Sequence, residues 1–203
     1  SSSADVTVAN GTLATMSSTD DITWSGIFTP STNTEDDNNT LALATSYTDT
    51  AGNAGASATT ANYEVDTLVP TISNVTASWG AYLNETEDDS SGTVTVVTSD
   101  AENSQTVTVS LNGTNYTGTV SDNSTTVTIA ASGLQDLTDG SSYPLTTNVS
   151  DVAGNAATEN TGTSFTYDKT SPTLAETTLV PSLTNDNSTQ YTFSSNEGGT
   201  ISI

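Results

Sequence analysis

The sequence contains no histidine and no cysteine, and a single basic residue, Lys169, stands against 24 acidic residues. Without histidine or cysteine the chain cannot build a Ser-His-Asp triad, a thiolate nucleophile, a zinc site of the usual ligands or a disulfide framework. No glycine-rich loop precedes Lys169, which excludes a phosphate-binding P-loop. Hydroxyl, amide, carboxylate and backbone groups are left for function.

This imbalance of charge limits the partners of the chain. The formal net charge of −23 at pH 7 predicts a surface that repels nucleic acid and anionic lipid. A cation is the natural partner of such a surface. Because the available ligands are hard oxygen atoms, Ca²⁺ fits them better than zinc or copper.

Long apolar stretches are also missing. No run approaches ~18 consecutive apolar residues, and no basic segment followed by an apolar one stands at the beginning, so neither a membrane helix nor a signal peptide is expected. The start at Ser1 predicts a segment internal to a longer protein. The lack of cysteine does not fix the compartment, because disulfide-free proteins occur on both sides of a membrane.

Composition and periodicity together favour β-structure. Hydrophobic residues make up 32% of the chain and charged residues 12%, and the polar majority is Thr, Ser and Asn. Threonine is a good strand former, although a disordered mucin-like stalk would have a similar composition. Alternation with period two, as in residues 93–96, 106–109 and 126–129, decides against the stalk. Turn residues about every ten positions indicate a β-sandwich, with a short helical turn expected only at 132–137.

An internal repeat is the strongest signal in the sequence. The segment Asp-Thr-Ala-Gly-Asn-Ala at residues 49–54 returns 102 positions later as Asp-Val-Ala-Gly-Asn-Ala at residues 151–156. Seventeen positions after each of these aspartates comes another acid, Asp66 or Asp168, which begins an Asp-x-x-x-Pro segment. A block of this length recurring at ~100 residues marks tandem modules of immunoglobulin size.

The repeat divides the chain into three parts. Residues 71–170 are expected to form one complete module, residues 1–70 the C-terminal part of another, and residues 171–203 the N-terminal part of a further one. The predicted fold is therefore all-β, with immunoglobulin-like β-sandwich modules joined end to end. An incomplete sandwich has unpaired strand edges and half a core, so neither terminal part is expected to fold well alone.

Several motifs carry a resemblance to a known family. They are the Asp-x-Ala-Gly-Asn turn, the Val-Asp-Thr and Tyr-Asp-Lys junctions before Pro70 and Pro172, and the segment 106–113 followed by Tyr116. Together they resemble the tandem immunoglobulin-like repeats of giant bacterial and archaeal surface proteins, and the resemblance covers essentially the whole chain. Similar repeats form the extender regions of large calcium-dependent adhesins, and related modules occur in surface-layer proteins.

The resemblance implies a secreted, cell-surface location and a rod-like spacer that calcium stiffens at its module junctions. The implied partners are Ca²⁺ ions, neighbouring modules of the same chain and identical chains in a surface assembly. Ligand binding is assigned to other domains of such proteins. No nucleic acid and no membrane insertion are expected for this segment.

The repeated acids and amides are candidate calcium ligands at the junctions. The turn glycine lets the Asp and Asn oxygens converge with backbone carbonyls, and Ca²⁺ takes six to eight oxygens at ~2.3 to 2.6 Å. The alternative is that the first Asp of each set only caps an Asx-type turn and the last is a solvated linker residue. The candidates form two sets, Asp49, Asn53 and Asp66 at the first junction, and Asp151, Asn155 and Asp168 at the second.

Two acidic runs, residues 35–37 and 85–89, are weaker candidates for peripheral calcium sites, because a charge run is usually a solvated face. Asp100 and Glu102, in a loop between two predicted strands, belong to the same weaker class.

Three functions stay open at this point. The first is a structural spacer of an adhesin, the second a lattice-forming surface-layer protein, and the third a module that contacts carbohydrate through an exposed patch at Trp79 and Tyr82. Trp24 alternates with Ile22 and Phe28, which favours a core position. Catalysis is not expected, since carboxylate pairs arise by accident in so acidic a chain and no cleft is indicated.

Overall fold

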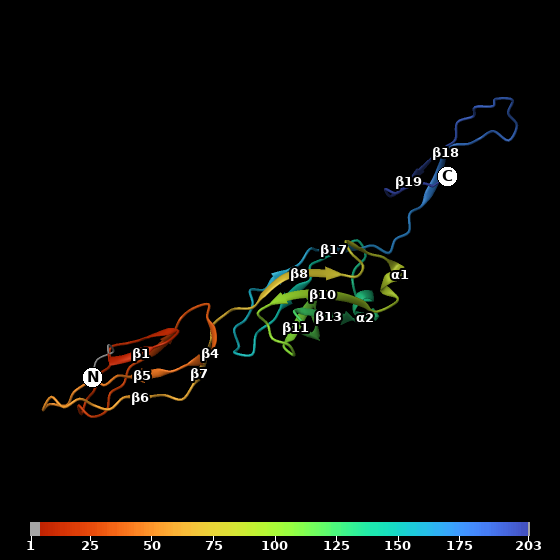
Figure 1. Ribbon diagram of the computed structural model, residues 1–203. Coiled ribbons are helices and arrows are strands. Elements are labelled where there is room, and N and C mark those ends of the chain that lie inside the picture. Colours follow the sequence, from red (N-terminus) through yellow and green to blue (C-terminus); the bar gives the residue numbers. More distant parts are fainter. Residues whose placement is uncertain (1–4, 203) are drawn as a thin grey trace.

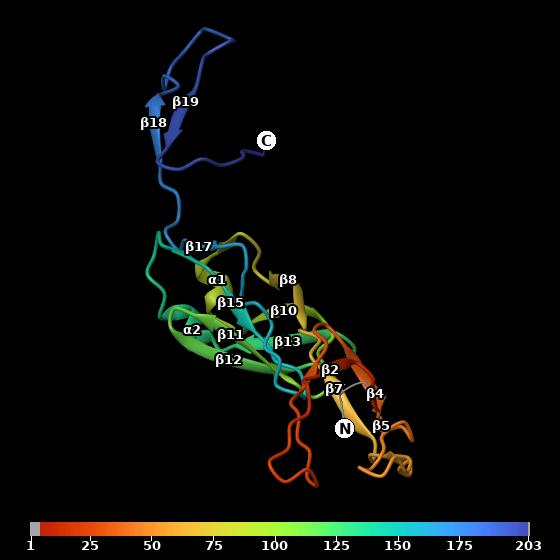
Figure 2. The ribbon, with the colours of Figure 1, turned by 90° about the vertical axis from the view of Figure 1, so that its left-hand side faces the viewer.

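The computed structural model describes residues 5–202, and regular structure in it is almost entirely β-strand. The predicted all-β fold is confirmed. Figure 1 shows that the N-terminal strands, a middle β-sandwich and a C-terminal hairpin follow one another along the long axis, and the rotated view agrees (Figure 2). Within residues 5–202, no helix is long and apolar enough to cross a membrane.

The N-terminal strands, residues 5–66, form three small antiparallel sheets, ordered β1-β5-β6, β2-β3 and β4-β7. Among these residues only Asn39 and Val65 are buried. The strands are β1 (Val6–Val8), β2 (Gly11–Leu13), β3 (Phe28–Pro30), β4 (Glu35–Asn39), β5 (Leu41–Leu43), β6 (Ala58–Thr59) and β7 (Tyr63–Asp66).

The middle sandwich, residues 71–167, contains the sheets β13-β10-β8, β12-β11-β15-β16 and β14-β17-β9. Its strands are β8 (Thr71–Ala77), β9 (Tyr82–Leu83), β10 (Gly92–Ser99), β11 (Thr106–Leu111), β12 (Thr114–Thr119), β13 (Ser124–Ile129), β14 (Ser142–Tyr143), β15 (Thr146–Asn148), β16 (Asn160–Thr161) and β17 (Phe165–Tyr167). Two short helices are α1 (Glu85–Asp88) and α2 (Ala131–Gln135). Helix α2 overlaps the predicted helical turn, whereas α1 was not predicted.

The alternating sequences explain the core of the middle sandwich. In β10, residues 92, 94, 96 and 98 are buried and the intervening ones are not, and β13 alternates in the same way. A threonine side chain on the outer face keeps its hydroxyl in water, while valines on the inner face meet the opposite sheet. The buried cluster draws all of its members from residues 79–167.

The two tryptophans differ from the expectation. Trp79 is 7% exposed and packs edge-on against Phe165, with ring centroids 5.1 Å apart. The predicted exposed aromatic patch is therefore wrong for Trp79, because contacts from a distant strand bury a residue that lies outside any alternating run. Trp24 is half-buried and not part of a closed core.

The C-terminal hairpin pairs β18 (Leu174–Thr178) with β19 (Thr192–Ser195) in antiparallel register. Every residue of β18 is exposed. The hairpin carries large apolar side chains that no second layer covers, including Leu174 and Tyr191.

Candidate functional site

The two copies of the repeated turn adopt the same conformation. In each, one carboxylate oxygen of the aspartate accepts the backbone N–H of the asparagine, at 2.8 Å for Asp49 and 2.7 Å for Asp151. The other carboxylate oxygen accepts the asparagine Nδ2 at 2.8 Å in both. Glycine is required between them, because φ at Gly52 and Gly154 is +92° and +96°. These bonds, led by that from the Asn53 side chain, lower the pKa of Asp49.

The surroundings of the two turns are different. Asp49 is exposed, whereas Asp151 is only 4% exposed. The Nδ2 atom of Asn155 also lies 3.3 Å from the carbonyl oxygen of Asp66 and 3.4 Å from its Oδ1 atom. This contact crosses the first junction, between the N-terminal strands and the middle sandwich. Glu102 lies beside it and accepts the Val152 N–H at 3.1 Å.

The structure corrects the predicted grouping of the candidate ligands. Asp66 does not meet Asp49 and Asn53 but lies against Asn155, which holds Asp151. The reason is the direction in which the chain runs along the long axis. The turn at residues 49–53 connects β5 to β6 at the end remote from the middle sandwich, and the chain then runs back through β7 to Asp66 (Figure 1). Asp66 thus faces the turn of the following unit.

Asp168 sits at the second junction, where the chain leaves β17. Its Oδ1 atom accepts the Thr170 N–H at 3.2 Å, in the same way that Asp66 accepts the Leu68 N–H at 3.0 Å. No hydrogen bond among residues 5–202 joins Asp168 to Asp151 or Asn155, so the predicted second set is also divided.

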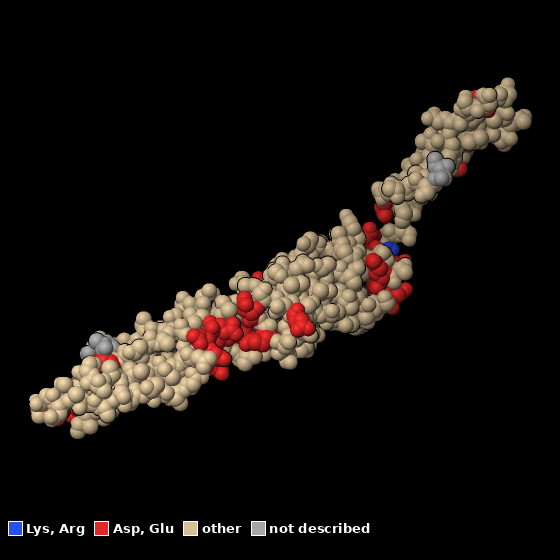
Figure 3. Space-filling model, in the orientation of Figure 1, with Lys and Arg blue, Asp and Glu red and all other residues tan. Residues whose placement is uncertain are grey.

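A residue that the sequence did not single out, Asp139, organises the second junction. Its carboxylate accepts the Lys169 N–H at 3.0 Å and the Thr170 hydroxyl at 2.7 Å. The Thr170 hydroxyl, followed by the Lys169 N–H, lowers the pKa of Asp139. The Lys169 Nζ atom lies 5.9 Å from the centre of the Tyr167 ring. Lys169 is the single basic residue of the chain, and Figure 3 shows it beside acidic residues.

The weaker acidic runs have structural roles. Residues 35–37 belong to strand β4 and not to a loop, and the backbone carbonyl of Asp36 accepts the side chain of buried Asn39 at 2.7 Å. In the run 85–89, Asp88 turns inward, is 5% exposed and accepts the hydroxyl of fully buried Tyr167. This contact raises the pKa of Tyr167 to about 12.

A local signal existed for the helix that positions Asp88. Asn84 and Glu87 form a capping box, in which the Asn84 side chain accepts the Glu87 N–H and Glu87 accepts the Asn84 N–H. The Asn-x-x-Glu spacing predicts such a helix start, but the burial of Asp88 could not be read from it.

The acids gather at the two junctions on the face shown in Figure 3, with the single basic residue at the second. Even so, no three acidic side chains among residues 5–202 converge closely enough to hold a metal ion by themselves. Any ion at the first junction therefore needs amide, carbonyl or water oxygens as well as carboxylates.

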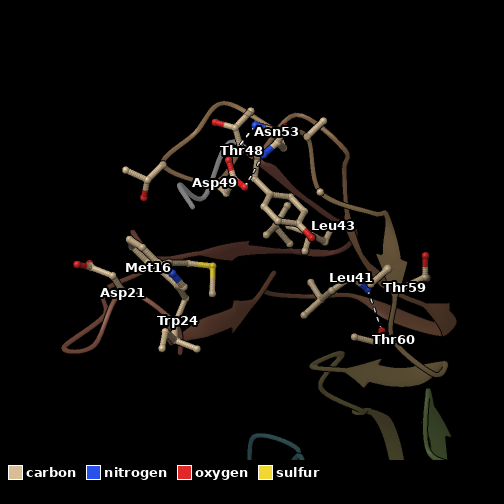
Figure 4. A pocket seen from close by; sticks show the side chains of 17 residues that line it. Met16, Asp21, Trp24, Leu41, Leu43, Thr48, Asp49, Asn53, Thr59 and Thr60 are labelled. Atoms are coloured by element: carbon tan, nitrogen blue, oxygen red, sulfur yellow. Dashed lines mark hydrogen bonds between the residues drawn. The ribbon is translucent and has the colours of Figure 1, made fainter.

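A hollow of about 1100 Å³ opens in the N-terminal strands (Figure 4). Its apolar lining includes Val6, Met16, Trp24, Leu41 and Leu43, and the Asp49 turn lies at its margin. No group of three or more acidic side chains lies in this part of the described chain.

Comparison with known families identifies part of the chain. Residues 2–65 match the family model of a bacterial Ig-like domain. The predicted resemblance to bacterial immunoglobulin-like repeats is thereby confirmed. No curated protein matches the chain.

Three solved structures are similar to the chain. A bacterial immunoglobulin-like domain from the M. primoryensis ice-binding adhesin is 29% identical, with 49% of this chain and 96% of that one covered and a TM-score of 0.35. A part of a 1.5-MDa bacterial ice-binding adhesin is 26% identical, with coverage of 66% and 43% and a TM-score of 0.38. A Ca²⁺-stabilized adhesin of an ice-binding Antarctic bacterium is 24% identical, with coverage of 84% and 44% and a TM-score of 0.42. The chain thus spans less than half of the latter two.

Proposed function

We propose that this chain, whose residues 2–65 match a bacterial Ig-like domain, is a non-catalytic spacer segment of a large bacterial cell-surface protein. In this proposal residues 1–70, 71–170 and 171–203 are parts of successive modules. The observation that carries it is the contact of Asn155 with Asp66, which joins two strand-rich bodies end to end along the long axis (Figure 1).

The linker at the first junction supports a stiff connection. Residues 67–70 join β7 to β8 and end in Pro70, whose ring restricts φ. The Thr67 hydroxyl donates to the Ser31 carbonyl at 2.7 Å, and the Leu68 N–H donates to Asp66 at 3.0 Å. A short linker with these bonds samples fewer orientations than a flexible one.

We further propose that Ca²⁺ binds at the first junction, held by Asp66, Asp151 and Asn155. The Asn155 Nδ2 atom is surrounded by three oxygens, Oδ2 of Asp151 at 2.8 Å and Oδ1 and the carbonyl of Asp66 at 3.4 and 3.3 Å. The two ends of an amide have nearly the same shape. Turning the amide over adds a fourth oxygen to this group, an arrangement that suits a hard cation.

The distribution of charge also favours a calcium site at the first junction. Asp151 is a nearly buried carboxylate, and a buried charge is costly unless a counter-charge accompanies it. The single basic residue of the chain is at the other end of the middle sandwich. By the same pattern, Asp49 and Asn53 would meet the acid of a module placed before them, and Asp168 the turn of a module placed after it.

Matched single substitutions test the calcium site. Asp66→Asn and Asp151→Asn should each abolish one binding event in isothermal titration with Ca²⁺. Asp49→Asn removes the same charge from the same kind of turn, and that event should survive. Equal losses in all three variants would show diffuse attraction of ions and contradict a junction site.

Shape and stability test the spacer itself. An ion that binds only the folded state adds ~2.7 kcal/mol at a concentration 100 times its dissociation constant. Chelation should therefore lower the melting temperature and loosen the first junction, as measured by calorimetry and small-angle scattering. NaCl at matched ionic strength is the control for screening. Unchanged scattering and melting after chelation would refute calcium stiffening.

The residues at the junctions do not support either of the two alternative functions. The carbohydrate-contacting module would use an exposed aromatic patch, and Trp79 is buried. No contact among residues 5–202 favours a lattice over a spacer.

A further inference from the structure

The chain contains one short turn sequence twice, Asn-Gly-Thr at residues 10–12 and again 102 positions later at residues 112–114. The backbone angle φ is +49° at Asn10 and +50° at Asn112, so the two asparagines also share this backbone conformation. An asparagine side chain reacts most readily with its own backbone when glycine follows, because glycine has no Cβ atom to shield the attacking nitrogen. Any difference in reactivity between the two copies is therefore expected to come from their surroundings.

The side chain of Asn10 is held in place by two neighbours. Its Nδ2 atom donates to Oδ2 of Asp36 at 2.6 Å and to Oδ1 of the fully buried Asn39 at 2.8 Å. The backbone carbonyl of Asn10 also accepts the Ser31 N–H at 2.8 Å. Turning this side chain toward the Gly11 nitrogen breaks both Nδ2 bonds, and one of them is a bond to a carboxylate.

The side chain of Asn112 has no such restraint. Asn112 and Gly113 form the tip of the β11–β12 hairpin, where Leu111 pairs with Thr114 across them. Both tip residues are exposed, and the place of a Cβ atom on Gly113 has no neighbour within 4 Å. Among residues 5–202 no partner bonds to the Asn112 side chain. Its carboxamide can therefore turn toward the Gly113 nitrogen without breaking a contact, and water reaches the site.

We propose that Asn112 is a site of spontaneous deamidation, a covalent modification that the matching Asn10 resists. The Gly113 backbone nitrogen gives its proton to base from the solvent and attacks Cγ of Asn112. A bond forms between these two atoms, the Cγ–Nδ2 bond breaks, and Nδ2 leaves as ammonia with a proton from water. Water then opens the cyclic imide at either of its carbonyls and leaves aspartate or isoaspartate at position 112.

The modification changes both the charge and the backbone of the hairpin tip. Each product adds one negative charge to the formal −23 of the chain. Isoaspartate also routes the main chain through the former side chain, so that the loop gains one backbone atom. The two-residue loop has positive φ at both positions, +50° and +78°, as a tight hairpin turn requires, and a lengthened loop departs from this geometry. The reaction needs only water, so it is independent of calcium and of the spacer function.

Peptide mass spectrometry of the full 203-residue chain after incubation at mildly alkaline pH provides the test. Cleavage at acidic residues places Asn10 in peptide 6–20 and Asn112 in peptide 103–122. Deamidation replaces NH₂ by OH, which raises the mass of a peptide by ~1 Da, and fragmentation locates the change. In the folded chain Asn112 should react at least ~10-fold faster than Asn10, because a hydrogen bond to a charged group contributes about that factor.

Three controls separate restraint by the structure from intrinsic reactivity. In urea both turns are unfolded, and the two Asn-Gly-Thr segments should then react at similar rates. Asp36→Ala removes the charged acceptor of the Asn10 side chain, so the rate at Asn10 should rise in the folded chain and the rate at Asn112 should not change. Asn112→Gln lengthens the side chain and disfavours ring closure, so the modification at position 112 should disappear.

A fast reaction at Asn112 and a slow one at Asn10, with the difference lost in urea, supports the proposal. Equal rates at the two positions in the folded chain overturn it, whether both are fast or both are slow. A difference that persists unchanged in urea also overturns it, because the cause would then be the local sequence and not the contacts of Asn10.

Discussion

Replacing Tyr167 by phenylalanine should destabilise the middle sandwich by more than the loss of one exposed hydroxyl would. The Tyr167 hydroxyl donates to Asp88, and both residues are buried, at 0% and 5% exposure. The substitution leaves the Asp88 carboxylate without this donor in a site that water barely reaches. The contact also ties helix α1 to β17, the strand from which the chain enters the second junction.

The expected magnitude follows from the charge of the acceptor. A hydrogen bond to a charged group contributes ~1.5 to 3 kcal/mol, and burial of the abandoned carboxylate places this case toward the upper value. In a sandwich of this size each kcal/mol lowers the melting temperature by ~4 to 8 °C. Asp88→Ala should cost a similar amount, because it leaves the Tyr167 hydroxyl without its partner. The double variant should cost less than the sum of the two.

Urea unfolding followed by Trp79 emission is the suitable assay. Trp79 packs on Phe165, two positions before Tyr167, so its emission reports the same core. A Trp24→Phe background removes the signal of the N-terminal strands. The four chains of the cycle then give the coupling free energy directly.

The pH dependence supplies an independent check. The pKa of Tyr167 rises from 10.0 to about 12 in the folded chain, so the folded state keeps a proton that the unfolded state loses. The parent chain should therefore lose stability from about pH 10 to about pH 12, and Tyr167→Phe should lose less. A coupling free energy below ~0.5 kcal/mol, together with identical profiles above pH 10, would refute the reasoning.

Two further predictions concern the cores and the second junction. Phe165→Ala should lower the unfolding free energy by ~3 to 5 kcal/mol, because it leaves a cavity in a closed core. Phe28→Ala should lower it far less, because Phe28 is only half-buried in the open N-terminal strands. Calorimetry of the two variants measures both effects. The lowered pKa of Asp139 means that its bonds to Lys169 and Thr170 persist above pH 3.8 and fail as the pH drops below that value. Scattering in chelator should therefore show the second junction loosening in acid, and Asp139→Asn should remove that pH dependence; an unchanged acid profile in the variant would contradict the role of this carboxylate.

The strands of the middle sandwich were predictable because the alternation of residues along each strand indicates which of its side chains are buried. In a strand, neighbouring side chains point to opposite faces, so an alternation of threonine and valine in β10 or β13 already states which face is inward. Trp79 was not predictable in this way. Trp79 follows β8 and lies outside any alternating run. Its burial depends on contact with Phe165, which comes much later in the sequence, at the start of β17.

The conformation of the repeated turn was determined by the sequence alone. Asp, Gly and Asn at fixed spacing close the same hydrogen bonds at residues 49–53 and 151–155, because every partner lies within four residues. What each turn meets was decided only by the tertiary structure. The spacing from Asp49 to Asp66 is equal to that from Asp151 to Asp168. Equal spacing, however, does not show toward which end of the molecule the chain runs between the two residues. The strands between Asp49 and Asp66 carry the chain to the opposite end of the N-terminal strands, and so Asp66 meets Asn155 instead of Asn53.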